Sequence, residues 1–564
     1  MSLRELAQAW IDGDPDPATR AELRALSDAD DFTALTERLA PLTFGTAGLR
    51  GAVGAGPGRM NLAVVLRTAF GIGRYLAEQP GSADGPVVIG FDARPTSRSF
   101  AEASAGVLLA SGLRVVAFSA PVATPLCAFF ARELGAPACI VVTASHNPRG
   151  DNGYKVYGPD AVQITAPLDA AIARHIAAAP PAVQVARHPV SFDAPSPGLT
   201  LLGASELERY FLAISAAIPG SGAAPELAIV HSALHGVGSA PMRRTLADAG
   251  FVGVSSVAVQ AEPDGTFPTT PCPNPEEPGT MDLALAEGER RSAALVLVND
   301  PDADRLAVAA RLDGELTVLD GNQLGALLAD FALATRAGAS TPLVLCSVVS
   351  SPLVEHIARA RGAHCERTHT GFKWLWSAAL ELERRGVGGF CFAYEEALGY
   401  SVFREVRDKD GIAAGRMTAE LAAQLASRGA TLFDRLYDLY AEHGLWLSAS
   451  RNIALSGADA TARIAKGLDA LGQRLATDAV VSKRDYRVGR PEQPRWLGVA
   501  PLVELELESG ARVLVRPSGT EPKLKLYGHV RGTLTSRADL PRNLAATRRA
   551  AAQLLEALEL QLGL

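Results

Sequence analysis

The sequence has few of the features that mark membrane, secreted or nucleic-acid-binding proteins. No uninterrupted apolar run approaches membrane-spanning length, and the N-terminus lacks the apolar core of a signal peptide. No long block of Lys and Arg occurs, and the formal net charge is −7. We therefore expect a cytoplasmic protein that has neither nucleic acid nor membrane as a partner, while a small anionic substrate fits because its site needs only local positive charge.

Cysteine is also scarce, with six residues in the chain and no CxxC pair. Several of the six lie in apolar runs, so reduced, buried thiols are expected in place of disulfides or zinc ligands. With 564 residues, 48% of them hydrophobic and 20% charged, the composition is that of an ordinary globular protein. The length predicts roughly three to five domains.

One loop combines a short buried strand with a serine. The apolar run Ala138 to Val142 predicts the strand, and Thr143-Ala144-Ser145-His146-Asn147-Pro148 follows it. Pro148 disfavours a helix at this point, so Ser145 is placed at the carboxyl end of a strand, where open α/β sheets keep their sites. Ser-His-Asn-Pro is also ordinary turn chemistry, so this loop alone leaves a purely structural role open.

A second loop concentrates carboxylates. The continuous apolar strand Ala293 to Asn299 is expected to be buried on both faces. Three alternating aspartates follow it, Asp300, Asp302 and Asp304. In an extended segment alternate side chains project to one side, so the three carboxylates converge on one cation, and oxygen ligands suit Mg²⁺. An EF-hand is excluded, because Arg305 and Arg311 stand where that loop requires Gly and Glu.

Four further segments carry candidate anion or sugar contacts. They are the glycine-rich stretch Phe44 to Gly51 with Arg50, the segment Asp151 to Tyr157 with Lys155, the Gly-Lys turn Thr370 to Trp374 with Lys373, and the loop Tyr394 to Tyr400 with Glu395. A glycine-rich turn lets the backbone approach a ligand, and a helix start beside a lysine is a credible anion contact. Asp92 and Arg94 form either a pair that supports the site or a surface ion pair.

The last motif is Arg516-Pro517-Ser518-Gly519-Thr520-Glu521-Pro522-Lys523, which follows a predicted hairpin. Arginine offers a bidentate fork to phosphate, hydroxyls add donors, and glycine exposes backbone N–H groups. Alternation of strands and helices along most of the chain predicts a mostly parallel α/β arrangement. Asn322 is expected to cap the helix Gln323 to Thr335.

Taken in order, these motifs resemble those of the α-D-phosphohexomutases, the phosphoglucomutase and phosphomannomutase family. Thr143 to Pro148 is similar to the family's phosphoserine loop, Asp300 to Arg305 to its metal loop, and Arg516 to Lys523 to its phosphate loop. The N-terminal sequence Ala9-Trp10-Ile11-Asp12 resembles that of the longer family members of the phosphoglucomutase-2 and phosphopentomutase type. The resemblance spans nearly the whole chain.

The resemblance implies three related α/β domains and a smaller α+β C-terminal domain around a central cleft. We place these domains at 1–204, 205–320, 321–440 and 441–564. It also implies a monomer or weak homodimer that isomerises glucose or mannose 1-phosphate and 6-phosphate, with a phosphoserine, Mg²⁺ and a sugar 1,6-bisphosphate such as glucose 1,6-bisphosphate as activator.

The implied roles follow the motifs. Ser145 carries the phosphoryl group and ligates the metal together with the three aspartates. The other implied catalytic residues are Lys155, Arg50, His146 and Arg305, and the implied substrate contacts are Lys373, Glu395, Ala397, Arg516, Ser518, Gly519 and Thr520. Lys155 is the expected proton carrier.

Two departures from the family's sugar loop bear on specificity. Ala397 stands where the family has serine, and Tyr400 stands where a histidine often follows. A phosphopentomutase therefore stays open as an alternative. Two further alternatives stay open. One is a regulator that binds a phosphosugar without turnover, which would need neither the serine nor the aspartates. The other is a metal-dependent phosphatase, which would release free phosphate.

Overall fold

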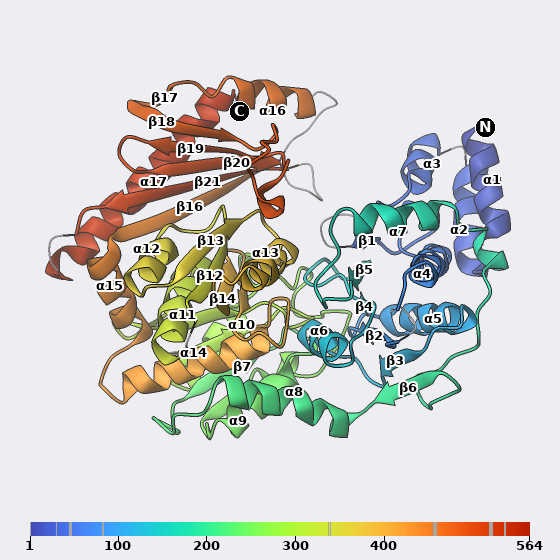
Figure 1. The fold of residues 1–564 in the computed structure, drawn as a ribbon, viewed down its shortest axis with the longest axis horizontal. Helices are drawn as coiled ribbons and strands as arrows, with labels where there is room; N and C mark the ends of the chain where they lie inside the picture. The colour runs from blue at the N-terminus through green and yellow to red at the C-terminus, as the bar shows by residue number, and fades with distance from the viewer. Residues whose placement is uncertain are drawn as a thin grey trace. The chain divides into compact units, whose positions relative to one another are not determined.

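The computed structural model describes residues 2–29, 31–43, 48–81, 84–336, 338, 340–454, 460–517, 523–534 and 537–563 (Figure 1). They form two compact units, unit 1 with Met1–Ala309 and Gly399–Ala423, and unit 2 with Ala310–Leu398 and Gln424–Leu564. The chain leaves unit 1 within β10 (Ala307–Leu312) and again within α14 (Gly411–Ala426). In the part of the chain so described, no helix is both long and apolar enough to cross a membrane.

Unit 1 contains a six-stranded sheet in the order β1-β5-β4-β2-β3-β6. Its strands are β1 (Leu49–Ala52), β2 (Val87–Phe91), β3 (Val115–Phe118), β4 (Cys139–Val142), β5 (Asp151–Tyr157) and β6 (Leu199–Leu202). The strands β4, β2, β3 and β6 are parallel, whereas β5 runs antiparallel to β4 and to β1. All residues of β2, β3 and β4 are buried, as expected for strands covered on both faces.

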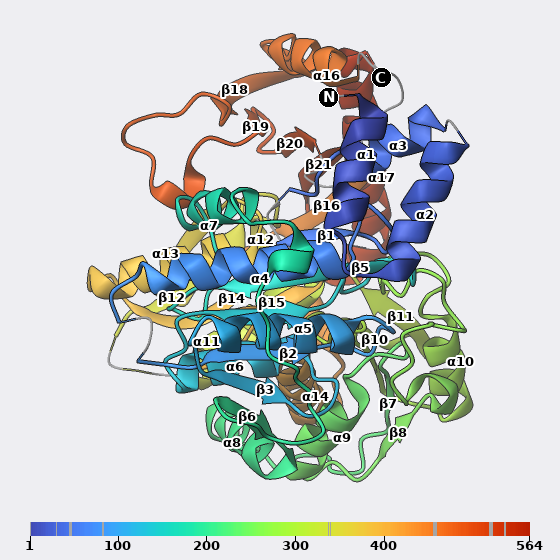
Figure 2. The same cartoon turned by 90° about the vertical axis from the view of Figure 1, so that its right-hand side faces the viewer.

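Helices α4 (Leu62–Ala77), α5 (Ser97–Ala110), α6 (Thr124–Glu133) and α7 (Leu168–Ala177) pack with this sheet (Figure 2). The sequence sets the start of α4, because the Asn61 side chain accepts a hydrogen bond from Val64 N at 2.9 Å. Apolar residues of α4 and α5, including Val65, Ile72 and Leu108, join the strands in one core.

A second parallel sheet in unit 1 centres on β7 (Ile229–Ser232), which pairs with β8 (Val254–Ser256) and β9 (Leu295–Val298). Helices α8 (Ala204–Ala217), α9 (Ser239–Asp248) and α10 (Asp282–Arg290) belong to the same part of the chain, and β15 (Gly399–Ser401) returns to unit 1. The residues of β9 are all buried, which confirms the burial expected of this strand.

Three N-terminal helices, α1 (Leu3–Gly13), α2 (Pro17–Asp28) and α3 (Phe32–Leu39), enclose a small core of their own. Ser2 and Glu5 form a capping box at the start of α1, and the Asp16 side chain caps α2. Ala55, from the turn after β1, joins this core and fixes the helices to the rest of unit 1.

Unit 2 begins with an α/β part in which β12 (Pro342–Ser347) pairs in parallel with β13 (His364–Thr368) and β14 (Gly389–Glu395). Its helices are α11 (Gly321–Thr335), α12 (Leu353–Ala360), α13 (Phe372–Arg384) and α15 (Leu432–His443). The strand β11 (Glu315–Leu319) pairs with β10 and not with these strands. The cap expected from Asn322 is wrong, because Asp320 accepts the bond from Gln323 N at 2.8 Å. Asn322 instead accepts a bond from Ser351 N.

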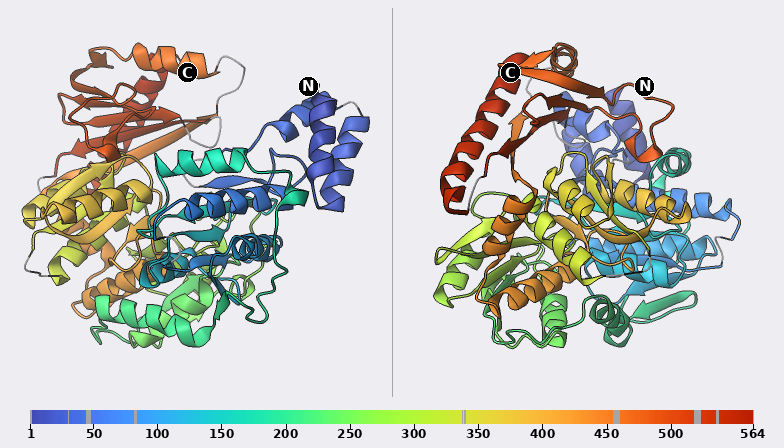
Figure 3. Two further views of the ribbon diagram at one scale, coloured as in Figure 1. Left: turned by 45° about the vertical axis from the view of Figure 1, so that its right-hand side comes forward. Right: turned by 60° about the vertical axis from the view of Figure 1, so that its left-hand side comes forward.

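The C-terminal part of unit 2 is an antiparallel sheet in the order β16-β21-β20-β19-β18-β17. Its strands are β16 (Leu445–Ala454), β17 (Arg474–Leu475), β18 (Asp478–Asp485), β19 (Val503–Leu507), β20 (Arg512–Pro517) and β21 (Lys523–Gly532). Helix α17 (Leu540–Leu562) lies along this sheet and α16 (Ala460–Asp469) packs on α17 (Figure 3). The predicted hairpin corresponds to β19 and β20.

Candidate active site

Ser145 lies in the turn that follows β4 and is 2% exposed. Its backbone has φ of +51°, and such a left-handed conformation costs a non-glycine residue about 1–2 kcal/mol. The Thr143 side chain holds the turn by accepting a hydrogen bond from Ser145 N at 2.8 Å. Strain of this kind persists where the surroundings determine the backbone, which is typical of functional loops.

Arg94 is the main support of this serine loop. Its guanidinium donates to the backbone carbonyls of Ser145 and Asn147, each at 2.7 Å, and to those of Pro148 and Asp151 at 2.8 and 2.9 Å. Asp92 forms a buried ion pair with Arg94 at 3.2 Å. The pair is therefore not a surface ion pair, and the structure supports the other interpretation that the sequence left open.

The Ser145 hydroxyl connects two loops that are distant in the sequence. Ser145 Oγ donates to Asp300 Oδ2 at 2.8 Å and lies 3.1 Å from His146 Nδ1. Burial, reinforced by the nearby charges of Arg305 and Arg50, holds the pKa of His146 well below its ordinary value. His146 is therefore neutral near pH 7 and is able to accept or donate one hydrogen bond to the hydroxyl.

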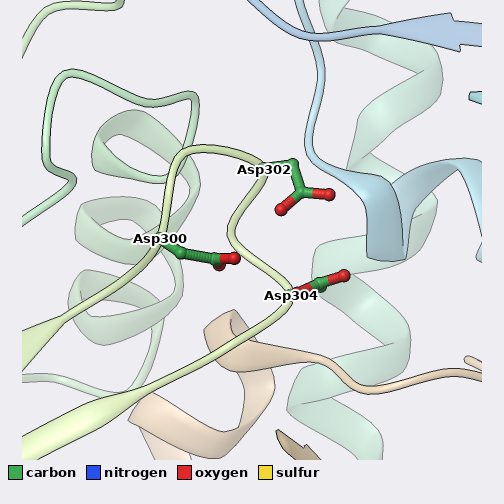
Figure 4. Close-up of side chains that lie close together, drawn as sticks. All are labelled: Asp300, Asp302 and Asp304. Carbon is green, nitrogen blue, oxygen red and sulfur yellow. The ribbon is translucent and has the colours of Figure 1, made fainter. Parts of the chain in front are cut away.

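Asp300, Asp302 and Asp304 converge, as Figure 4 shows, and each offers a ligand atom within 4.8 Å of the others. All three are completely buried. We expected an extended segment here, but the three aspartates lie in a tight turn. Ala303 adopts φ of +56°, and its N–H donates a hydrogen bond to Asp300 O at 2.9 Å. The predicted convergence of the carboxylates is found, although a turn produces it.

A glycine opposite this turn makes room for it. A Cβ atom added to Gly236, which follows β7, would lie only 2.3 Å from the backbone of Pro301. Gly236 therefore allows the loop after β7 and the aspartate turn to pack backbone against backbone.

Two lysines neutralise part of the aspartate charge. Lys155 Nζ lies 2.7 Å from Asp302 Oδ2 and 2.8 Å from Asp304 Oδ2, and Lys409 Nζ lies 2.8 Å from the same Asp304 atom. Burial acts to lower the pKa of Lys155, but the two carboxylates outweigh it and raise that pKa above its ordinary value. Lys155 contacts the aspartates and makes no described hydrogen bond to Ser145.

The three carboxyl groups differ in their ionisation. Burial opposes the charge on Asp302, but Lys155 and then Lys409 lower the pKa of Asp302 below its ordinary value. Burial, followed by the charges of Asp304 and Asp302, raises the pKa of Asp300 to about 8. The like charges of its neighbours and its burial therefore disfavour the ionised form of Asp300.

The donor set fits a divalent cation. The lysines use the Oδ2 atoms of Asp302 and Asp304, whereas both Oδ1 atoms are buried without a hydrogen-bond partner among the described residues. Unpaired buried carboxylate oxygens are costly unless a cation or donor meets them. Hard oxygen ligands favour Mg²⁺ over softer metals, so the cluster is compatible with a metal site.

Thr124, at the start of α6, bonds to the same Asp302 oxygen as Lys155. Its hydroxyl donates to Asp302 Oδ2 at 2.7 Å and its N–H donates to Asp302 O at 3.0 Å. Thr124 and Lys409 are site residues that we did not find from the sequence. Their signals were weak, because Thr124 opens an ordinary apolar helix and Lys409 lies in a mixed run of charges.

The two predicted arginines lie at the same site. Arg50, on β1, donates to Asn147 Oδ1 at 3.0 Å, and Arg305 donates to Glu276 Oε2 at 3.1 Å. The N–H of Arg305 also donates to Asp300 Oδ1 at 3.1 Å. The Arg50 guanidinium therefore contacts the serine loop, and Arg305 belongs to the segment that carries the aspartates.

The remaining candidates belong to unit 2. Lys373 is buried in the first turn of α13, and Glu395, at the end of β14, accepts a hydrogen bond from Gly371 N, so the Gly-Lys turn and the Glu-Glu loop are joined. Ala397 follows in that loop and is partly buried. Arg516, on β20, donates to the Tyr527 hydroxyl at 3.1 Å. Ser518, Gly519 and Thr520 lie outside the described residues.

Family models match four stretches of the chain. They are the α/β/α domains I, II and III of phosphoglucomutase/phosphomannomutase at residues 41–182, 208–314 and 320–442, and the C-terminal domain at residues 486–535. The chain therefore belongs to the phosphoglucomutase/phosphomannomutase family, as its motifs predicted, and it has the expected architecture of three α/β domains and a C-terminal domain.

Known proteins support this assignment over most of the chain. The "Probable phosphoribomutase" of Schizosaccharomyces pombe is 34% identical over 562 residues, covering 94% of each chain. The "Probable phosphomannomutase" of Haemophilus influenzae is 34% identical over 488 residues, covering 85% of this chain and 95% of that protein. The open form of a phosphoglucomutase from Paramecium shares the fold, with a TM-score of 0.70 and 16% identity over 94% of this chain and 97% of that one.

These relatives are named for different sugars but for one reaction class. The chain is accordingly a phosphosugar mutase, an isomerase that works by phosphoryl transfer. The choice of sugar is not fixed by these names.

Proposed function

We propose that the protein interconverts hexose 1-phosphate and hexose 6-phosphate, with glucose or mannose as the sugar. Phosphorylated Ser145 gives its phosphoryl group to the free hydroxyl of the sugar monophosphate, which forms a sugar 1,6-bisphosphate. The other phosphoryl group of that intermediate then returns to Ser145 and releases the isomeric monophosphate. Each step forms one P–O bond and breaks another, so no phosphate is lost.

One observation carries this proposal. The Ser145 hydroxyl lies 2.8 Å from Asp300, within a buried cluster of three aspartates that retains two partnerless oxygens among the described residues. A phosphoryl carrier beside a divalent-cation site is the arrangement that phosphoryl transfer needs.

The metal is the first requirement. Asp300, Asp302 and Asp304, together with Ser145, would hold Mg²⁺, and the bound ion neutralises negative charge as the phosphoryl group moves. Thr124 and Lys155 hold Asp302 in place from outside the ligand set. Such outer contacts orient carboxylate ligands and tune their affinity for the metal.

The cations of the site would stabilise the moving phosphoryl group. Arg50, on β1, contacts Asn147 of the serine loop, Arg305 follows the aspartates, and Lys409 pairs with Asp304. We assign proton transfer to Lys155. Although burial acts to lower its pKa, Asp302 and Asp304 raise it, so Lys155 is held in its protonated form and would act first as a proton donor.

Unit 2 would supply the sugar and phosphate contacts. We assign ring hydroxyls to Glu395, which is already fixed by Gly371 N, and the stationary phosphate to Arg516, Ser518, Gly519 and Thr520. Lys373 would add a further cation, and Ala397 would line the sugar. The same proposal includes domain boundaries near residues 204, 320 and 440, a cytoplasmic location, a monomer or weak homodimer, and activation by glucose 1,6-bisphosphate.

A specific observation favours a second candidate, a phosphopentomutase. Ala397 and Tyr400 depart from the family's sugar loop, and the phosphoribomutase of S. pombe matches the chain nearly end to end. Under this alternative the same serine and aspartates would serve ribose or deoxyribose 1-phosphate and 5-phosphate. The chemistry is unchanged, and only the sugar contacts differ.

The test is a mutase assay with Mg²⁺ and catalytic glucose 1,6-bisphosphate, offering glucose, mannose and ribose 1-phosphates separately. We expect turnover of at least one sugar, and a loss of at least about 10³-fold in Ser145→Ala, as for removal of other nucleophiles. Ser111→Ala changes an exposed serine just after α5 and should keep the wild-type rate. The preferred sugar decides between the two candidates.

Other outcomes would contradict the proposal in distinct ways. Release of free phosphate in place of an isomer would indicate a phosphatase. Binding of sugar phosphate without turnover would indicate a regulator. Equal rates for wild type and Ser145→Ala would show that the serine carries no phosphoryl group.

A further inference from the structure

An apolar cavity lies in unit 1 among the N-terminal helices and the body of the first α/β domain. Its volume is about 370 Å³, and its walls come from α1, the end of α3, the turn around Pro57, α4 and the segment after α7. Helices α1 and α4 can be followed in Figure 2. None of the lining residues belongs to the candidate active site. The volume lies within the range of small-molecule sites.

Trp10 and Arg67 meet in the wall of the cavity, and one nitrogen of each is covered by protein atoms. Trp10 Nε1 and Arg67 Nε are both buried and have no hydrogen-bond partner among the described residues. The rest of the Arg67 guanidinium donates to Ala179 O at 3.2 Å and lies over the Trp10 ring, with 5.8 Å between Arg67 Cζ and the ring centroid. The indole and the guanidinium thus form one stacked face of the cavity.

Arg67 also lacks a counter-ion in the structure as described. No carboxylate forms an ion pair with it, and burial alone lowers its pKa from the ordinary value. Of its neighbours in the cavity, Trp10, Pro57 and Pro181 are apolar. A charge that is partly desolvated without a partner is destabilising, and a bound anion would offset that cost.

Two properties together specify a ligand class. The apolar walls suit an aromatic or aliphatic body, and the Arg67 guanidinium, the one charged group among the lining residues, suits a negative charge. A sugar phosphate does not match, because its hydroxyls would meet apolar walls without partners.

We propose that this cavity binds a small organic anion with an apolar, preferably aromatic, body. The anionic group contacts the Arg67 guanidinium, and the body packs between α1 and the two prolines. This site is independent of the mutase reaction proposed above, so its test does not depend on turnover.

The probe is 8-anilinonaphthalene-1-sulfonate, which combines an aromatic body with a sulfonate. Titration of the full chain should show one saturable site, with energy transfer from Trp10 that Trp10→Phe reduces. Arg67→Met, which keeps an unbranched apolar stem but removes the guanidinium, should weaken binding about tenfold or more. Arg74→Met changes an exposed arginine on the same helix and should bind like wild type.

A second variant separates the cavity from any other site. Ala9 lines the cavity at an exposed position of α1, so Ala9→Phe should fill it without disturbing the core and should abolish binding. The uncharged probe N-phenyl-1-naphthylamine should bind wild type and Arg67→Met equally, because it has no charge to lose. Absence of a saturable site, no effect of Ala9→Phe, or equal sulfonate affinity in Arg67→Met and Arg74→Met would each overturn the proposal.

Discussion

Lys155 and Asp302 form a buried ion pair with 2.7 Å between Lys155 Nζ and Asp302 Oδ2. The pair joins β5 of the first sheet to the aspartate turn after β9. The lysine thereby supplies, in the absence of metal, part of the positive charge that three neighbouring carboxyl groups require.

This pairing predicts a metal-dependent loss of stability in Lys155→Met. Removing one partner of a buried ion pair costs about 3–5 kcal/mol, because a desolvated charge is left unpaired. We expect the free energy of unfolding in EDTA to fall by about that amount, and Mg²⁺ to restore more stability to the variant than it adds to wild type. Denaturant unfolding with and without Mg²⁺ measures both. Lys466→Met, at an exposed position of α16, is the control.

Arg94 should affect turnover through the position of Ser145. A lysine at this position cannot donate to four carbonyls, so the serine loop would shift in Arg94→Lys. A misplacement of about 1 Å is able to cost about 10²-fold in rate. We expect kcat to fall by about 10- to 100-fold while the affinity for Mg²⁺, measured by calorimetry, stays unchanged. Arg98→Lys, at an exposed site on α5, should leave kcat unchanged, and a loss of Mg²⁺ affinity in Arg94→Lys would contradict this role.

Lys409 should act as a cation at the phosphoryl group. Its ammonium lies 2.8 Å from Asp304 Oδ2, and although burial acts to lower its pKa, Asp304 and Asp408 raise that pKa above the ordinary value. Removing one group that stabilises developing charge costs about 10²–10³-fold in rate. We expect Lys409→Met to lose about that much kcat, with partial recovery in Lys409→Arg. An unchanged kcat would limit Lys409 to a structural role.

Because His231 is buried, we expect the folded protein to lose stability in acid. Burial lowers its pKa to about 4, so the folded protein resists protonation while the unfolded chain takes up a proton at about pH 6.5. Its contribution is therefore complete above about pH 6.5 and is lost as the pH falls towards 4, by about 3 kcal/mol in total. Denaturant midpoints between pH 7 and 4 should decrease less steeply in His231→Gln than in wild type. The exposed His188→Gln should follow wild type, and equal slopes for all three would contradict the prediction.

The sequence predicted those parts of the site that lie directly after buried strands. Ser145 and the three aspartates each follow an apolar run, so periodicity located both loops and the family motifs gave their chemistry. The turn that unites Asp300, Asp302 and Asp304 was not predicted, because it depends on the left-handed backbone of Ala303 and on the space left by Gly236.

Thr124 and Lys409 show what local reasoning misses. Thr124 is far from Asp302 along the chain, and only the packing of α6 against the aspartate turn brings their side chains to 2.7 Å. Asn322 failed as a cap for a local reason, since Asp320 precedes it by two residues and reaches Gln323 N first. Long-range packing thus decides which polar residues reach a site, and competition between neighbours decides which of them caps a helix.

The bonds from Thr124 and Lys155 to Asp302 have a consequence for hybrid enzymes. The serine and the aspartates lie in separate domains. Thr124 and Lys155 of the first domain donate hydrogen bonds to the aspartates of the second. A chimera that exchanged the first domain alone would therefore break the metal site unless the incoming segment also brought a threonine and a lysine at matching places. The two domains should be inherited and recombined as a single module.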